Sequence, residues 1–440
     1  MRHHAPAEES VNGEGEGAAA PGPLAGLKVL DLSRVLAAPW ATQILGDLGA
    51  EVLKVEQPGG GDDTRRWGPP FLEDGSERPD AAYYLCANRN KQSLAIDFAR
   101  PEGAALVRRL ALQADILVEN FRTGGLEKYG LDKATLCAAN PRLIYCSITG
   151  FGHTGPYAQR GGYDFLIQGM SGLMSITGRP DGAPGAGPMK VGLPVSDLFT
   201  GLYATISILA ALRERDRSGQ GQHLDCALLD SQLALLVNQG MNYLVGGAVP
   251  QRLGNDHPNV VPYRDFAAAD DYVIVACGND GQFRALCQLL GLDEMAEDPR
   301  YATNAGRARE RRTLELALAK AIAPWKAADL LAAMAKAGVP GGPINTIDQV
   351  LADPQVAARG LLQAMRRADG TALTVIGYPG RFSRTPPSYR QAPPWLGQDT
   401  EAVLAGTLGL EPREIARLQA AGVVQCAVPR AARQDVELPA

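Results

Sequence analysis

The stretch LKVLDLSRVLAAPWATQILGDLGAEVLKVEQP, residues 27–58, decides the fold class. It opens with a run typical of a strand (LKVLDLS), continues with an amphipathic helical pattern (LAAPWATQILGDLGA), and closes with a second strand run (EVLKVEQP). A strand, a helix and a strand in this order form a βαβ unit with parallel strands. The stretch therefore predicts an α/β protein.

The same alternation continues along the chain. Strand runs follow at SLAIDF (93–98), DILVENF (115–121) and LIYCSITG (143–150), and a helical pattern follows Pro101. The first 150 residues or so therefore predict a parallel, doubly wound sheet. Helical patterns return at 197–215 and 228–246, with a domain boundary expected near 220–230. Mixed strand and helix runs of a smaller domain come next.

Composition narrows the class of protein. The 440 residues predict two domains, and the net charge of −5 without a basic block argues against a nucleic-acid partner. The longest apolar run, 198–212, is shorter than the ~20 residues that span a bilayer, so no membrane segment is predicted. Residues 1–23 lack the apolar stretch of a signal peptide, and we expect a disordered tail. Seven cysteines without CxxC spacing favour reduced thiols and a cytoplasmic protein.

Several charged positions have two interpretations each. Arg65 lies in the Gly/Pro-rich loop 58–71, and Arg89 lies in NRNKQS (88–93). These guanidinium groups either hold an anionic ligand or are solvated surface charges.

The first βα turn lacks GxGxxG, which disfavours a nicotinamide enzyme, although a helix N-terminus there could still receive phosphates.

Two aspartates stand at predicted helix starts. Asp197 in VSDLFTG lies where a loop gives way to a helix, so Ser196 or Asp197 is the expected N-cap. A carboxylate at this place can also be a nucleophile, with its pKa lowered by the helix end. Asp164 in GGYDFLIQG is either another cap or an acid of the site. The five histidines show no metal-ligand spacing, so no metal is predicted.

Together these motifs resemble the family III coenzyme A transferases over nearly the whole chain after the tail. The segments that carry the resemblance are GDLGAEVLKVE (46–56), GDDTRRWGPPF (61–71), NRNKQSLAIDF (88–98), DILVENFRTGGLEKYGL (115–131), IYCSITGFGHTGPYAQRGGYDFLIQGMSGLMSITG (144–178), VSDLFTGLYA (195–204) and GVPGGPIN with DPQVAARG (338–360).

The resemblance implies a Rossmann-like large domain built from both chain ends, 24–220 and 326–440, around a smaller α+β domain at 225–325. It implies an interlocked homodimer, and it makes Asp197 the expected nucleophile. Asp164, singled out by its position before a mixed apolar segment, is the candidate for a supporting acid. The family's coenzyme A contacts fall on one set of positions here: Leu36, Ala37, Gln57, Ile96, Asp97, Phe98, Ala99, Asn120, Phe121, Arg122 and Lys128. Gln57 and Lys128 stand where family members use Arg.

The implied reaction transfers coenzyme A through an aspartyl mixed anhydride and an aspartyl thioester. The coenzyme A thioester is a substrate, so no tightly bound cofactor is expected. Succinyl-CoA is the expected donor and glutarate the expected acceptor, with Arg65 and Arg89 as hypothesised partners of the second carboxylate. The resemblance also places a flap at 254–259, which is poorer in Gly here.

Two other functions remain open at this point. An α-methylacyl-CoA racemase shares the fold and uses a His-Asp pair, but Tyr163 stands before Asp164 here. A coenzyme A-binding protein without turnover is the other alternative.

Overall fold

The computed structural model describes residues 21–427, in which the chain forms two compact units. The first contains residues 21–147, Ala204–Leu224 and residues 363–427. The second contains Ile148–Tyr203 and Asp225–Leu362. The first and the last parts of the described residues thus belong to the same unit. The division differs from the predicted boundaries, because 148–203 and 326–362 pack with the second unit.

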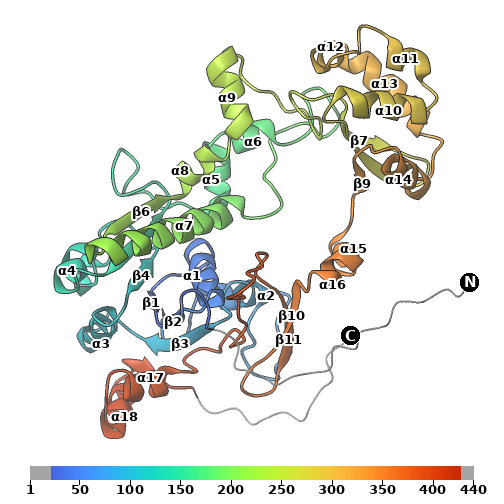
Figure 1. Ribbon diagram of the computed structural model, residues 1–440. Coiled ribbons are helices and arrows are strands. Elements are labelled where there is room, and N and C mark those ends of the chain that lie inside the picture. The colour runs from blue at the N-terminus through green and yellow to red at the C-terminus, as the bar shows by residue number, and fades with distance from the viewer. Residues whose placement is uncertain (1–20, 428–440) are drawn as a thin grey trace, which may run out of the picture. The chain divides into compact units, whose positions relative to one another are not determined.

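A seven-stranded sheet organises the first unit in the order β12-β3-β2-β1-β4-β5-β6 (Figure 1). The pairs from β3 to β5 are parallel, and β12 runs antiparallel to β3. The elements up to the start of α5 are β1 Lys28–Asp31, α1 Ala37–Asp47, β2 Glu51–Glu56, η1 Asp63–Arg66, α2 Ala82–Leu85, β3 Lys91–Ile96, α3 Pro101–Ala111, β4 Ile116–Glu119, η2 Glu127–Tyr129, α4 Lys133–Ala139 and β5 Ile144–Thr149.

Residues 363–427 complete this unit. Their elements are β10 Leu362–Arg366, β11 Ala372–Ile376, α17 Thr400–Gly406, α18 Pro412–Ala420 and β12 Val424–Gln425. Strands β10 and β11 form a separate two-stranded sheet. Between the two parts of the unit lie α7 Val195–Ser218, which starts in the second unit and ends in the first, and β6 His223–Ala227.

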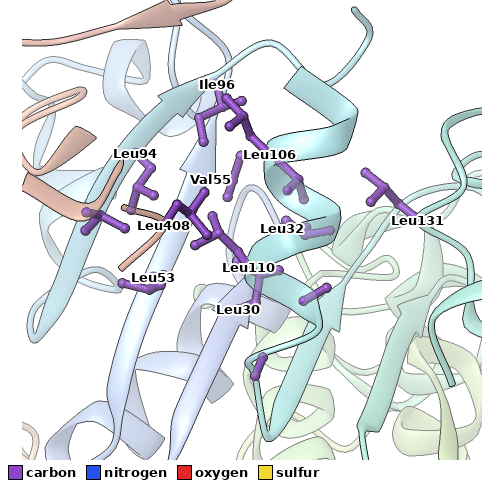
Figure 2. Packing of buried hydrophobic residues seen from close by; sticks show 14 of the residues in the cluster. Leu30, Leu32, Leu53, Val55, Leu94, Ile96, Leu106, Leu110, Leu131 and Leu408 are labelled. Atoms are coloured by element: carbon purple, nitrogen blue, oxygen red, sulfur yellow. The ribbon is translucent and has the colours of Figure 1, made fainter. Parts of the chain in front are cut away.

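Helix α3 shows why the sequence folds as it does around this sheet. Pro101 lies in the first turn, where its missing N–H costs no helical hydrogen bond. The negative Glu102 in the first turn and the positive Arg108 and Arg109 in the last turn interact favourably with the helix dipole. Its buried residues recur at helical spacing: Gly103, Leu106, Val107, Leu110 and Ala111. Figure 2 shows Leu106 and Leu110 packed beside strand leucines such as Leu30 and Leu53 in one apolar cluster.

The second unit has more helix and a small antiparallel sheet in the order β7-β8-β9. Its apolar core includes Phe266, Val273, Phe283 and Leu314. The remaining elements are α5 Asp164–Met170, α6 Leu173–Ile176, α8 Leu228–Ala234, α9 Val237–Gly246, β7 Tyr263–Ala267, β8 Tyr272–Ala276, α10 Asp280–Leu289, α11 Asp293–Glu297, α12 Asn304–Arg309, α13 Arg311–Ile322, α14 Ala327–Lys336, β9 Gly341–Pro343, α15 Ile347–Leu351 and α16 Pro354–Ala358.

The predicted α/β class and the mostly parallel sheet are confirmed. The pattern at 228–246, expected as one helix, forms α8 and α9, because the backbone of Val237 takes φ 36° and interrupts the helix. Residues 1–20 of the predicted tail lie outside the described residues.

One helix, α7, is long and apolar enough to cross a membrane by length and composition alone. Half of its most apolar window is buried inside the protein. A core helix of a water-soluble protein passes the same test, so α7 is weak evidence for a membrane span.

Candidate active site

The two aspartates singled out by the sequence meet in the second unit. Asp164 is the first residue of α5, and Asp197 lies in the first turn of α7. Oδ1 of Asp164 accepts the backbone N–H of Ser196 at 2.8 Å and that of Asp197 at 3.4 Å. Asp164 therefore supplies the cap of α7 from another helix. The expectation that Ser196 or Asp197 is the N-cap is wrong, because α7 begins at Val195.

Asp164 is in turn fixed by a buried glutamine. Nε2 of Gln168, one turn along α5, donates to Oδ2 of Asp164 at 2.6 Å. Oε1 of Gln168 accepts the backbone N–H of Val191 at 2.9 Å, which ties down the segment leading into α7. Sequence reasoning missed Gln168, although its spacing of four residues from Asp164 on a helix was an available signal.

Two glycines bring the preceding loop together just before α5. A Cβ atom on Gly150 would lie 2.6 Å from the Cα of Gly162, so the two backbones pass too closely for any side chain at either position. This contact closes the segment 150–162, and α5 starts at Asp164 directly after it. The glycines thus help to place the Asp164 carboxylate.

Asp197 is a buried carboxylate whose charged neighbour is another carboxylate. The residue is only 9% exposed. Burial raises the pKa of its carboxylate, the negative charge of Asp164 raises it further, and the result is a pKa of about 7. Within residues 21–427, no ion pair joins either aspartate to a cation. The expectation that the helix end lowers the pKa of Asp197 is wrong, because burial and Asp164 outweigh the helix end. A more basic carboxylate is a stronger nucleophile once it is ionised.

The predicted coenzyme A contacts gather at the carboxyl edge of the sheet in the first unit. The chain order leads from β1 outward to β2 and β3 on one side and to β4 and β5 on the other, so the strand order reverses between β1 and β4. Ligands of open parallel sheets bind at such a switch point, outside the carboxyl ends of the strands. Leu36 and Ala37 follow β1, Gln57 follows β2, and Asn120 follows β4.

Side chains join the loops at this edge. The Asn120 amide accepts from the backbone N–H of Arg34 at 2.9 Å and donates to its carbonyl oxygen at 2.6 Å. The Phe98 ring, just after β3, packs edge-on against the Phe121 ring with centroids 5.7 Å apart. Loops that are distant in sequence thus form one surface.

The remaining predicted contacts at this edge differ in exposure. Ile96 is fully buried, while Asp97 is partly covered and Ala99 is exposed. Arg122 is exposed, as are the two departures from the family pattern, Gln57 and Lys128. Nζ of Lys128 lies 4.8 Å from the centroid of the Tyr129 ring. The exposed side chains can meet a ligand, whereas Ile96 can contribute only to the packing beneath it.

Arg65 is a buried structural residue and not a surface charge. Its guanidinium donates to both carboxylate oxygens of Glu56, at 2.7 and 2.8 Å, and to Asp80 at 2.7 Å. It also stacks on the Tyr84 ring and reaches the carbonyl oxygen of Pro394. These donors are engaged inside the protein, which argues against Arg65 as a partner of a substrate carboxylate.

Arg89 is engaged in the same way. Its Nε and Nη2 donate to the two oxygens of Asp47 at 2.9 and 2.6 Å, and its Nη1 donates to the carbonyl oxygen of Ile376. Arg89 is 3% exposed. The alternative of a solvated surface charge is wrong for Arg65 and Arg89, and the carboxylate-binding role stays a prediction against which these contacts argue.

The segment 254–259, where a flap is expected, is held by several hydrogen bonds. The Asn259 side chain bonds to Asn242 at 3.0 Å, and its backbone carbonyl accepts from Asn304 at 2.7 Å. The carbonyl oxygen of His257 accepts from Arg311 at 2.7 Å. The segment is thus tied to its own unit at both of these residues.

Across the described part of the chain, no group of three His, Cys, Asp or Glu side chains could hold a metal ion.

Comparison with known proteins settles the family. The model of the CoA-transferase family III matches residues 24–400, which is most of the chain. The chain belongs to CoA-transferase family III. This CoA-transferase is 53% identical to the succinate–glutarate CoA-transferase of Agrobacterium fabrum, covering 87% of this chain and 95% of that protein. It is 43% identical to the human succinyl-CoA:glutarate CoA-transferase, covering 91% of this chain and 90% of the human protein.

A solved structure agrees with the fold of this CoA-transferase. The crystal structure of a CAIB/BAIF family protein from Brucella suis matches with a TM-score of 0.78 and 51% identity. The match covers 88% of this chain and 99% of that protein. The predicted family and the predicted enzyme class are therefore confirmed.

Proposed function

We propose that this CoA-transferase moves coenzyme A from succinyl-CoA to glutarate, with Asp197 as the nucleophile. The observation that carries the proposal is the buried Asp197 carboxylate, which has Asp164 and no cation as its charged neighbour within the described residues. The names of the two curated relatives support this donor and this acceptor.

The reaction follows from the chemistry of that carboxylate. Asp197 attacks the thioester carbonyl, the C–S bond breaks, and a mixed anhydride and coenzyme A thiolate form. The thiolate then attacks the aspartyl carbonyl of the anhydride, which releases succinate and leaves an aspartyl thioester. Glutarate attacks that thioester and expels the thiolate, forming a second anhydride. The thiolate finally attacks the glutaryl carbonyl, which yields glutaryl-CoA and restores Asp197.

The fixed surroundings of Asp197 serve this sequence of steps. Asp164 holds the backbone of Ser196 and Asp197, so the nucleophile starts each step from one position. Ser196 also donates through its hydroxyl to Gln232 at 2.8 Å, which anchors the same turn from α8. Because both acids enter ionised, Asp164 acts as a positioning residue and as an electrostatic neighbour, with no proton to transfer.

We place the adenosine and phosphate parts of the thioester at the β1–β4 switch point. The exposed Arg122 and Lys128 there provide positive charge, and Asn120 fixes the turn beside them. Coenzyme A is a substrate in this scheme and returns to solution as a new thioester after each turnover.

The test combines a reaction and a trapped intermediate. Wild-type protein and Asp197→Asn are each mixed with succinyl-CoA and a panel of C4–C6 diacids, and new thioesters are identified by mass. Wild type should form glutaryl-CoA, and the peptide containing Asp197 should gain the mass of one coenzyme A less one water. Acyl exchange with other diacids but not glutarate would contradict the acceptor. The absence of any exchange would contradict the proposal as a whole.

We also propose that the protein works as an interlocked homodimer. Large apolar side chains of the second unit are exposed on α5, α8 and α9, including Phe165, Leu233, Met241, Leu244 and Val245. An apolar surface of this extent is typical of a protein interface, and a second copy would cover it. Light scattering at micromolar concentration should give the dimer mass, and a monomer mass would contradict this proposal.

The protein is proposed to act in the cytoplasm. Within residues 21–427, no disulfide joins any of the seven cysteines, and Cys146, Cys277 and Cys287 are buried. Cysteines that form no disulfide are typical of a reducing compartment. Fractionation of the source cells should find the protein with cytoplasmic markers, and recovery from an oxidising compartment would contradict this location.

A further inference from the structure

The turn between β1 and α1 contains a residue in an unusual conformation. Val35 has φ 71°, in the left-handed region that β-branched residues rarely adopt. Such a conformation persists only when surrounding contacts impose it, and it is found most often at functional sites. Leu36 and Ala37 follow directly, and the turn lies at the carboxyl edge of the sheet beside β4.

A buried carboxylate imposes this conformation. Both oxygens of Asp62 accept the backbone N–H of Val35, at 3.2 and 3.3 Å. Asp62 also accepts the backbone N–H and the hydroxyl of Thr64, at 3.0 and 2.8 Å. One carboxylate thus joins the loop after β2 to the turn after β1.

A buried lysine completes the arrangement. Nζ of Lys54, on β2, lies 3.0 Å from Oδ2 of Asp62 and donates to the carbonyl oxygen of Ser33 at 2.8 Å. Both side chains of the pair are fully buried. The pair therefore hydrogen-bonds to the backbone of the turn at two residues, Ser33 and Val35. The residue between these two, Arg34, is held by the Asn120 amide, which forms two hydrogen bonds with its backbone.

We propose that Asp62, paired with Lys54, is a positioning residue that holds the β1–α1 turn in its left-handed conformation for binding of the coenzyme A thioester. This inference rests on the proposed binding of acyl-CoA at the switch point. Asp62 acts through the backbone of Val35, so its loss should weaken binding of the thioester and spare the chemistry at Asp197.

A matched aspartate separates positioning from general stability. Asp74 is also buried, pairs with Arg367 at 3.2 Å, and accepts the backbone N–H of Ser76 two residues on, much as Asp62 does from Thr64. The hydrogen bonds that join Asp74 to Ser76 and Arg367 lie outside the β1–α1 turn. Asp62→Asn should raise the KM for succinyl-CoA about tenfold and leave kcat and the KM for glutarate within about twofold. Asp74→Asn should lower the Tm with both KM values within about twofold of wild type.

A second variant tests the same inference if Asp62→Asn does not fold. Lys54→Met combined with Asp62→Asn removes both charges at similar volume, which proteins tolerate better than one unpaired charge. It should keep the fold and weaken coenzyme A binding in calorimetry. Adding Val35→Gly should restore part of that binding, because glycine adopts φ 71° without strain.

Unchanged succinyl-CoA KM and coenzyme A affinity in the folded variants would overturn the inference, while wild-type glutaryl-CoA formation would leave the proposed function intact. Equal KM increases in Asp62→Asn and Asp74→Asn would also overturn it. Absence of transfer by wild type is the separate failure of the proposed function.

Discussion

Buried carboxylates occur in both units, but their neighbours differ. In the first unit, burial alone would raise the pKa of Asp31, yet the charges of Lys91 and Lys54 outweigh it and hold that pKa well below its usual range. In the second unit, burial raises the pKa of Asp197, and its charged neighbour Asp164 raises it further. Paired carboxylates are structural, whereas a buried carboxylate beside another carboxylate is prepared to react.

The sharpest test of this difference removes the reactive carboxylate. Asp197→Asn should lower kcat/KM by about 10⁴-fold or more, because no other group replaces the nucleophile. The same variant should be more stable than wild type at pH 8 by on the order of 2–4 kcal/mol, since a buried charge is lost. Activity assays and urea unfolding measure the two effects. A destabilised and fully active variant would contradict both halves of the comparison.

Removing a cation from the first unit should have the opposite effect on stability. Nζ of Lys91 contacts Asp31 at 3.0 Å, and both side chains are fully buried. Lys91→Met leaves Asp31 without its nearest cation and should destabilise the protein by about 3–5 kcal/mol. Urea unfolding measures this. Arg417→Met, which breaks exposed pairs with Glu102 and Glu414, is the control and should leave the urea midpoint nearly unchanged.

The pH dependence of activity should show how Asp164 affects the pKa of Asp197. Only ionised Asp197 attacks, so kcat/KM should rise with pH through about 7. Asp164→Asn removes the like charge and should move this inflection to lower pH by roughly one unit, while burial keeps it above the ordinary value. A pH–rate profile that does not move would show that Asp164 acts on the backbone alone.

Protein stability should show the same titration with a defined sign. The pKa of Asp197 is raised in the folded state, so folding favours its protonated form. Its contribution is fully present below about pH 4 and is lost as pH rises through about 7. The stability difference between wild type and Asp197→Asn should therefore grow over this range. A constant difference would mean that the folded-state pKa is not raised.

The smallest expected effect concerns substrate binding by the first unit. Because Arg89 is engaged by Asp47, Arg89→Ala should lose stability while its KM for glutarate stays within about twofold of wild type. A glutarate KM raised more than tenfold, in protein shown to be folded, would restore Arg89 as a carboxylate partner.

Much of this protein could be predicted from local sequence. The βαβ pattern at 27–58, the helix after Pro101 and the position of Asp197 at a helix start all depend on neighbouring residues, whose periodicity and polarity are visible in the sequence. Arg65 and Arg89 stand in Gly/Pro-rich and polar segments, where local sequence favours exposure. Their burial depends on Glu56, Asp80 and Asp47, and two of these partners are brought close only by the sheet and α1.

The sequence by itself determined the α/β class and the family, and it singled out Asp197 as the expected nucleophile, because these depend on residue spacing and on motifs. Tertiary structure alone decided which charges are paired. It brought Asp164 of α5 to the start of α7, and it brought Asp62 to the backbone of Val35. The physical reason is that the pKa and the role of a carboxylate depend on burial and on charges within a few ångströms, which the folded chain supplies from distant positions.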